Sequence, residues 1–171
     1  MTTIYLLRHA KSRWDEPGVD DHDRGLAPRG ERDAPAMGRH AAGQGWRPDL
    51  VLCSTAKRAV LTASAFLEAA GFKPELRHSR SLYLAAAPDL LNLVRQQEAD
   101  GIMLVGHDPG IHELALLLTG PHASQRLQEK FPTAALAVIA FEGRSPAEIA
   151  AGEGMLSAFV RPKDLRQARP D

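Results

Sequence analysis

Short apolar runs alternate along this chain with longer segments whose apolar residues recur at helical spacing. The apolar runs are predicted to form strands at about 3–7, 50–53, 75–78 and 102–105. The helical spacing occurs at about 29–42, 55–70, 88–97 and 111–118. Because helices are the usual crossovers between parallel strands, this alternation predicts an α/β fold built in layers.

The C-terminal part of the sequence predicts a hairpin followed by a polar end. Residues 134–141 and 155–160 are apolar enough to pair as the two arms of a long hairpin. From Arg161 on, the sequence is interpreted as a polar, solvated tail. A chain of 171 residues fits one domain, so we expect a single domain over 1–171.

The sequence also predicts one long loop near the N-terminus and two helix caps. Residues 14–29 are polar and contain two prolines and two glycines, which is typical of a long and often functional loop. Ser54 or Thr55 is expected to cap the helix that ends near residue 70, and Asp108 to cap the helix that follows it.

Charge and cysteine content exclude several kinds of function. Lys+Arg and Asp+Glu both number 21, so no overall positive field exists to hold nucleic acid or an anionic membrane, and any anion site must be a local cluster. Cys53 is the one cysteine, so no intramolecular disulfide can form, which suits a cytoplasmic location. No signal peptide is recognised, and no apolar stretch approaches the roughly 20 residues of a membrane helix.

Basic and histidine side chains follow three of the predicted strands. Arg8 and His9 come directly after the first strand, Arg58 lies in the first turn after the second, and His107 follows the fourth. Ligands bind at the carboxyl ends of strands in open α/β sheets, so these side chains are expected to converge on one pocket. The helix that starts near Thr55 is expected to point the positive end of its dipole at this pocket, which favours a bound anion.

This set of side chains is sufficient for phosphoryl transfer through a covalent intermediate. His9 would attack phosphorus, while Arg8 and Arg58 would hold the equatorial oxygens with forked hydrogen bonds. His107, either protonated or as a neutral donor, would stabilise the charge of the transition state. The arginines disfavour protonation of His9, and as fixed cations they leave no need for a metal or another cofactor.

Motifs in a fixed order along the chain also carry a resemblance to a known family. They are Leu7 to Ser12, Asp21 to Arg24 with Leu26, Pro28, Arg29 and Gly30, Ser54 to Arg58 with Thr62, and Val105 to Gly110. With them the chain resembles the histidine phosphatase superfamily, and more narrowly its small phosphohistidine phosphatases of the SixA type. The likeness runs from about Ile4 to Leu118, with a weaker echo at Arg161 to Lys163.

The resemblance implies a fold and a role for each residue. It implies a three-layer, phosphoglycerate-mutase-like sandwich in which helices flank a mixed, mostly parallel sheet. It implies that His9 is phosphorylated and that Arg8, Arg58 and His107 form the phosphate pocket. The implied substrates are phosphate esters or phosphoramidates, including phosphohistidine on a carrier protein.

One departure from the family pattern bears on the substrate. Many superfamily members place a glutamate after the third strand to protonate an alcohol leaving group, but residues 81–85 contain no carboxylate, and Asp89 is the nearest one downstream. An imidazole leaves more easily than an alkoxide without a proton donor, so the gap favours a P–N substrate. Asp21, His22 or Asp23 in the loop remain possible replacements for the acid.

Several further residues are candidates for binding substrate. Lys11, Ser12 and Arg24 are expected to contact phosphate or substrate, although Arg24 has the alternative of pairing with an acidic neighbour in the loop. His112 stands one helical turn beyond His107, but without other nearby ligands the two do not predict a metal site.

The sequence as a whole is therefore interpreted as a metal-independent phosphatase that acts on phosphohistidine in a protein. Two alternatives remain open: a phosphomonoesterase for small molecules, and a module that binds phosphate or phosphoproteins without turnover. Trp14 and Tyr83 are interpreted as packing residues.

Overall fold

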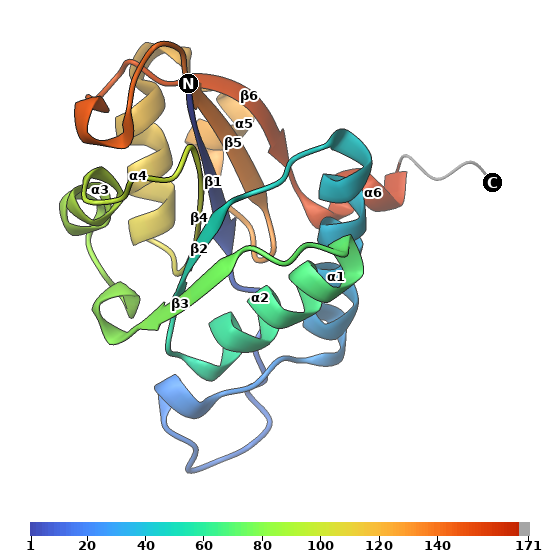
Figure 1. Ribbon diagram of the computed structural model, residues 1–171. Coiled ribbons are helices and arrows are strands. Elements are labelled where there is room, and N and C mark those ends of the chain that lie inside the picture. The colour runs from blue at the N-terminus through green and yellow to red at the C-terminus, as the bar shows by residue number, and fades with distance from the viewer. Residues whose placement is uncertain (168–171) are drawn as a thin grey trace.

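A mixed, six-stranded sheet forms the middle layer of the fold in the computed structural model, which describes residues 1–167 (Figure 1). The strands are β1 (Thr2–Arg8), β2 (Leu50–Ser54), β3 (Glu75–Ser79), β4 (Gly101–Gly106), β5 (Leu136–Phe141) and β6 (Met155–Val160). Their order across the sheet is β3-β2-β4-β1-β5-β6. The first four are parallel, whereas β5 runs antiparallel to both β1 and β6. The predicted mixed, mostly parallel sheet and its C-terminal hairpin are confirmed.

Helices cover both faces of this sheet and complete the three layers. One face carries α1 (Pro28–Gln44), α2 (Lys57–Ala70) and α6 (Pro162–Gln167), and the other carries α3 (Ala87–Arg95), α4 (Gly110–Thr119) and α5 (Gln125–Glu129). Short 3-10 turns are η1 (Asp21–Asp23), η2 (Arg80–Leu82), η3 (Gly120–His122) and η4 (Pro146–Glu148). No helix within residues 1–167 is long and apolar enough to cross a membrane.

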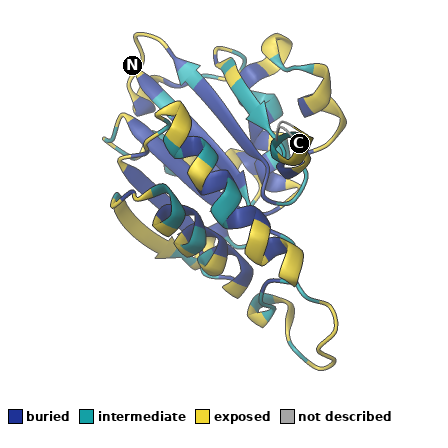
Figure 2. Ribbon diagram, turned by 90° about the vertical axis from the view of Figure 1, so that its right-hand side faces the viewer, coloured by how far each residue is buried: buried dark blue, intermediate teal, exposed yellow. Residues whose placement is uncertain are grey.

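Two apolar cores form because side chains alternate across the strands. In β1, Ile4 and Leu6 pack toward α3 and α4, whereas Tyr5 and Leu7 pack toward α1 and α2. Figure 2 shows the central strands buried along their length, while β3 at the edge of the sheet is exposed. Each fully buried leucine of this kind contributes about 1.5–3 kcal/mol to stability.

A glycine sets the close packing of α1 on α2. A Cβ atom at Gly38 would collide with the backbone carbonyl of Phe66 in α2, so only glycine fits at this position. The α1–α2 pair has the most extensive contact between any two helices of the described chain. This packing fixes the position of α2 on the face of the sheet, and with it the first turn of α2, which carries Arg58.

Both cap predictions were wrong. Ala56 is the N-cap residue of α2 and Pro109 that of α4, and no side chain caps either helix. The Ser54 hydroxyl instead accepts a hydrogen bond from the amide of Ala56 before the helix begins and also contacts His107. The Ser54 side chain thus bonds to a histidine, a role that the preference of serine for helix N-caps does not predict.

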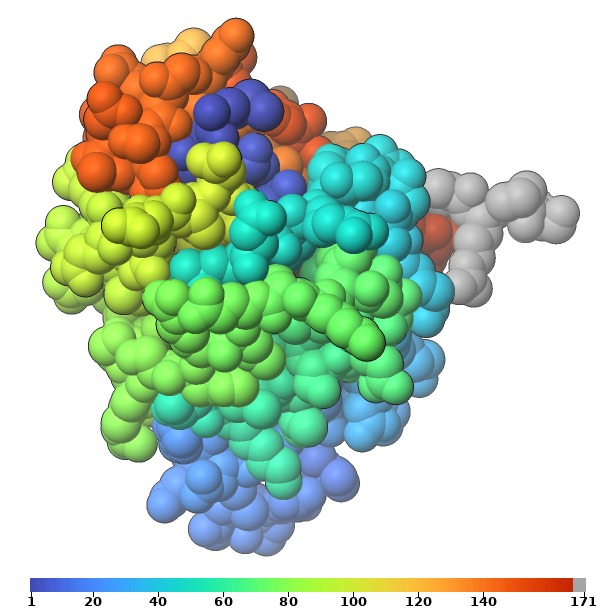
Figure 3. All heavy atoms as spheres, viewed as in Figure 1, coloured from blue at the N-terminus to red at the C-terminus, as the bar shows by residue number. Residues whose placement is uncertain are grey.

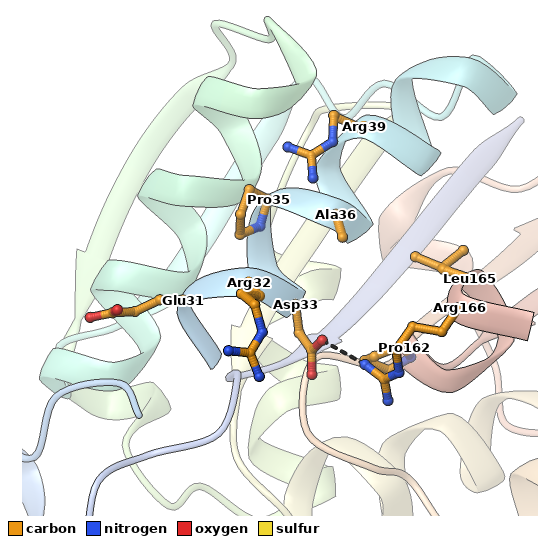
Figure 4. A pocket seen from close by; sticks show the side chains of 9 residues that line it. All are labelled: Glu31, Arg32, Asp33, Pro35, Ala36, Arg39, Pro162, Leu165 and Arg166. Atoms are coloured by element: carbon orange, nitrogen blue, oxygen red, sulfur yellow. Dashed lines mark hydrogen bonds and ion pairs between the residues drawn. The ribbon is translucent and has the colours of Figure 1, made fainter. Parts of the chain in front are cut away.

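The prediction of a solvated tail from Arg161 was also wrong. Residues 162–167 form α6, which packs on α1, and Leu165 contacts the apolar core on that face. The reason is visible at Asp33, a buried carboxylate of α1 that needs a cation and receives a 2.9 Å hydrogen bond from Arg166 (Figure 4). The rest of the predicted tail lies outside the described residues.

The predicted loop projects from the end of the molecule at which β1 and β2 stop (Figures 1 and 3). A bridge between Ser12 and Leu26 closes its base, and η1 lies within it. A Cβ atom at Gly30 would overlap the backbone carbonyl of Lys11, so glycine permits α1 to begin tightly against this base. The loop therefore leaves and rejoins the domain at one fixed point.

Candidate active site

The ends of three parallel strands bring the predicted site residues together. Arg8 is in register with Gly106, and the amide of His9 donates a 3.0 Å hydrogen bond to the Gly106 carbonyl. The rings of His9 and His107 lie 5.3 Å apart between centroids, and Nη2 of Arg58 is 3.4 Å from Nδ1 of His107. The residues that follow β1, β2 and β4 thus form one cluster, as expected from the topology of an α/β sheet.

His9 is a neutral imidazole with one free nitrogen. Its Nδ1 lies 2.7 Å from the carbonyl oxygen of Ala10, which can only accept, so Nδ1 carries the proton and Nε2 keeps its lone pair. Burial, together with the nearby His107, Arg58 and Arg8, lowers the pKa of His9 to about 3, although the hydrogen bond to Ala10 acts in the opposite direction. At neutral pH the Nε2 atom of this ring is therefore available as a nucleophile.

His107 is held by two hydrogen bonds that fix its tautomer. Nδ1 accepts from Arg58, so Nε2 carries the proton and donates to the Ser54 hydroxyl at 2.8 Å. Burial, followed by the charge of Arg58, lowers the pKa of His107 to about 4. Of the two forms left open by the sequence, this geometry favours the neutral one.

Arg58 is buried, and its guanidinium is held by the loop residue Asp21. Nη1 donates to the Asp21 carbonyl at 2.6 Å, and Nη2 donates to the Asp21 carboxylate at 2.9 Å. The Tyr83 hydroxyl donates to the same carboxylate oxygen. Tyr83 first, and then Arg58, keep the pKa of Asp21 below its usual range. An anion is therefore already bound to the Arg58 fork.

Arg8 offers further donors at the end of β1. Its Nη1 donates to the carbonyl of Phe131 at 2.8 Å, which fixes the side chain. Its buried Nε has no hydrogen-bond partner among the described residues. A guanidinium held at one nitrogen and free at another is suited to bind an oxyanion.

Thr62 joins the two halves of this cluster. Its hydroxyl accepts a 2.9 Å hydrogen bond from the amide of Ala10 and donates a 2.7 Å bond to the carbonyl of Arg58. Both bonds are buried, so water does not compete for them. The segment that carries His9 and the helical turn that carries Arg58 are therefore fixed to one side chain.

A cavity of about 260 Å³ opens over the cluster. It is lined by Arg8, His9, Lys11, Ser12, Trp14, Asp21, Arg58 and Thr133. Lys11 and Ser12 thus lie where substrate-binding residues were expected. His107 is not part of this lining and contacts the cavity through Arg58.

Arg24 lies outside the cavity lining, beside Trp14. Its guanidinium stacks 4.2 Å from the centre of the Trp14 ring, and no ion pair joins it to Asp21 or Asp23 within residues 1–167. Trp14 itself is 65% exposed and lines the cavity, so the interpretation of this residue as packing was wrong. Arg24 is placed to support the Trp14 wall.

Trp14, Asp21 and Thr133 complete the cavity lining in ways that the sequence did not predict. Thr133 comes from the turn before β5, and nothing in its sequence context signals a site. Asp21 was expected as a substitute acid or as a partner of Arg24, whereas the structure pairs it with Arg58. The one available signal for Asp21 was its place close to Arg24 in a polar loop, which marks the loop as functional but does not indicate a contact with Arg58.

In the part of the chain that is described, no metal centre is formed, and His107 and His112 do not come together as a pair. No group of three or more His, Cys, Asp or Glu side chains in residues 1–167 could hold a metal ion. His112 donates to the carbonyl of Leu127 at 2.6 Å and does not meet His107. A larger cavity of about 480 Å³ lies between α1 and α6, away from the histidine cluster (Figure 4).

The two buried histidines predict a loss of stability in acid. In the unfolded chain both histidines have a pKa of 6.5, so they become protonated below that pH. In the folded protein His9 and His107 stay neutral until the pH falls to about 3 and about 4, respectively. Each histidine should therefore lower the free energy of unfolding by about 1.4 kcal/mol per pH unit in this window. Urea unfolding at pH 7, 6 and 5 measures this slope. It should be shallower in His107→Asn, and an unchanged slope would contradict the assignment.

Comparisons with known proteins agree with this geometry. Residues 4–82 match the family model of the histidine phosphatase superfamily (branch 1). A relative in Mycobacterium tuberculosis, an uncharacterized protein, is 35% identical over 164 residues, which cover 92% of this chain and all of that protein. A 2,3-bisphosphoglycerate-dependent phosphoglycerate mutase of Thermobifida fusca is 45% identical over 73 residues, which cover 42% of this chain and 30% of the mutase.

A solved structure extends the agreement to nearly the whole fold. The crystal structure of a protein from Agrobacterium tumefaciens, assigned as the phosphohistidine phosphatase SixA, superposes with a TM-score of 0.82 at 33% identity. The match covers 94% of this chain and 98% of that one. The family match and the full-length likeness show that this chain belongs to the histidine phosphatase superfamily.

Proposed function

We propose that this protein is a phosphatase that removes the phosphoryl group from phosphohistidine in another protein through a covalent intermediate on His9. The observation that carries the proposal is the buried, neutral ring of His9, which has a free Nε2 and lines a cavity together with Arg8 and Arg58. Arg8, Arg58 and His107 act with it, and Lys11 and Ser12 contact the substrate. Arg24 supports substrate binding through Trp14.

The reaction proceeds in two displacements. Nε2 of His9 donates its lone pair to phosphorus, and the bond from phosphorus to the leaving nitrogen breaks, with the electron pair retained by the departing imidazole. A water molecule then attacks phosphorus, the bond to Nε2 breaks, and inorganic phosphate leaves. The arginines hold the equatorial oxygens in both steps and supply fixed positive charge in place of a metal.

Binding of the phosphoryl group requires an exchange at Arg58. In the free protein the Asp21 carboxylate occupies the Arg58 fork, so an incoming phosphate must displace it. The dianion also raises the proton affinity of His107, which then becomes a third positive partner beside Arg8 and Arg58. The loop carrying Asp21 is therefore expected to move when substrate binds.

The absence of a suitable proton donor favours a P–N substrate. Asp21 is the one carboxylate among the cavity residues, and its pKa lies below the usual range, so it is ionised at neutral pH. An alkoxide leaving group would lack a proton, whereas an imidazole that already carries one leaves readily.

A substrate panel tests this proposal. With a chelator present throughout, we expect kcat/KM for a phosphohistidine protein and for phosphoramidate to exceed that for unactivated sugar phosphates by about 100-fold or more, the usual worth of a missing general acid. Comparable turnover of sugar phosphates would refute the preference for P–N bonds. Loss of all activity with the chelator would refute metal independence.

The likeness to a phosphoglycerate mutase favours one second candidate, a phosphomonoesterase in which Asp21 becomes the acid. The two candidates predict opposite results for Asp21→Asn. If Asp21 only competes for Arg58, removing its charge should lower the inhibition constant of inorganic phosphate about tenfold, because like charges no longer meet. If Asp21 is the acid, turnover of esters should fall about 100-fold or more. Asp20→Asn, an exposed neighbour, is the control.

A further inference from the structure

A second cavity, of about 330 Å³, lies where the start of α1, α5 and the start of α6 meet. We call it the basic cleft, because six of its ten lining residues are arginine or lysine and one is a glutamate. Its lining is Arg29, Arg126, Glu129, Lys130, Pro132, Thr133, Arg161, Pro162, Lys163 and Arg166. In a chain whose formal net charge is zero, this is a strong local concentration of positive charge.

Part of this charge is balanced inside the protein, and part is not. Asp164 pairs with Arg161 at 2.7 Å and with Arg126 at 3.7 Å, while the buried Asp33 pairs with Arg166 at 2.9 Å. Arg161 is largely buried and is held by Asp164, whereas the side chains of Arg126 and Arg166 are paired but mostly exposed.

Lys130 and Lys163 complete the positive charge of the basic cleft. Both are exposed, and neither forms an ion pair with any residue in 1–167. The six arginine and lysine side chains of the cleft are balanced by three carboxylates, those of Glu129, Asp33 and Asp164. This leaves an excess of three positive charges.

The basic cleft adjoins the 260 Å³ cavity over His9, which we call the catalytic cavity, because the two share one lining residue. Thr133 lines both, and it stands two residues after Phe131, whose carbonyl holds Arg8. On its other side, Pro162 and Arg166 line both the basic cleft and the cavity between α1 and α6 shown in Figure 4. A polypeptide that enters the catalytic cavity can thus continue past Thr133 over a positively charged surface.

We propose that the basic cleft binds carboxylate side chains that flank the phosphohistidine in the substrate protein. This rests on the proposed function. The cations come from three separate elements and surround a volume larger than the catalytic cavity, which suits several carboxylates along a chain better than one small anion. Since an extended chain advances about 3.3 Å per residue, acidic residues a few positions from the phosphohistidine reach the cleft.

Two synthetic phosphohistidine peptides test the proposal. They are identical except that one carries four glutamates beside the phosphohistidine and the other four glutamines. At low salt we expect kcat/KM to be about tenfold higher for the glutamate peptide, and this ratio should fall as salt is added. Lys130→Gln and Lys163→Gln should each lower the ratio about two- to threefold.

Lys73→Gln is the matched control, because Lys73 is equally exposed but lies between α2 and β3, beside another cavity. It should leave the ratio unchanged. Equal kcat/KM for the two peptides in the unmodified protein, or an equal loss in Lys73→Gln, would overturn the proposal. A changed inhibition constant for inorganic phosphate in Lys130→Gln, without a changed ratio, would assign the cleft to free phosphate and would also overturn it.

A binding measurement separates this proposal from the catalytic one. Fluorescence anisotropy with unphosphorylated, labelled versions of the two peptides should show weaker binding of the glutamine peptide, and of the glutamate peptide to Lys163→Gln. This result does not require turnover. If neither phosphorylated peptide is hydrolysed, the proposed function fails, while equal binding of the two labelled peptides refutes the basic cleft alone.

Discussion

His9→Ala is expected to lower the rate of phosphate release by about 10⁴–10⁶-fold, the range lost when an enzyme's nucleophile is removed. The physical reason is that the other neutral ring at the site, His107, has both nitrogens engaged, by Arg58 and Ser54, and cannot replace the attacking atom. Release of phosphate from phosphoramidate measures the effect. Acid-labile phosphate should be trapped on the unmodified protein during turnover and be absent from the variant.

The matched control is His78→Ala, because His78 is exposed on the edge strand β3. Its activity should equal that of the unmodified protein. Residual activity above about 1% in His9→Ala would be incompatible with a nucleophilic role of this magnitude. Unimpaired binding of phosphate by an unmodified protein that never becomes phosphorylated would instead identify a binding module without turnover.

Arg58→Lys is expected to reduce kcat by about 10²–10³-fold, although the charge is kept. Lysine lacks the planar fork with which Arg58 donates from Nη1 to the Asp21 carbonyl and from Nη2 to the Asp21 carboxylate. It cannot hold two equatorial oxygens of a phosphoryl group at once, and this contact strengthens as charge spreads in the transition state. The loss should therefore appear mainly in kcat rather than KM.

The control for this change is Arg39→Lys, an exposed arginine of α1. Urea unfolding should accompany the kinetics, because Arg58 is also buried and paired with Asp21. An Arg58→Lys protein that folds normally and turns over at the original rate would show that a point charge suffices. The fork would then have no part in catalysis.

The layers of the fold and the meeting of the site residues were predictable because both depend on short-range patterns. Short apolar runs such as residues 50–53 are typical of buried strands, and parallel strands place the residues that follow them at one edge of the sheet. His9, Arg58 and His107 each stand directly after such a strand or in the next helical turn. Their convergence needs no knowledge of distant contacts.

The features that escaped prediction depend on contacts between distant residues. The sequence from Arg161 on is as polar as a tail, and its helix is explained by distant partners: Leu165 packs on the apolar core, and Arg166 bonds to Asp33, 133 positions earlier. Thr133 lines the catalytic cavity because the turn before β5 passes it, and Asp21 because its loop folds back on Arg58. Local patterns carry no information about such pairings.

The position of Thr62 has a consequence for how such a protein can acquire new targets. The buried Thr62 hydroxyl fixes the segment that carries His9, the proposed nucleophile, to the helical turn that carries Arg58, the proposed phosphate ligand. The spacing of these two backbone segments therefore does not depend on the projecting loop. The loop can then be exchanged or lengthened to admit other molecules while the reaction step stays intact. Selectivity and chemistry are in this sense largely separate, and they meet where Asp21 binds the Arg58 guanidinium and His22 bonds to Thr55.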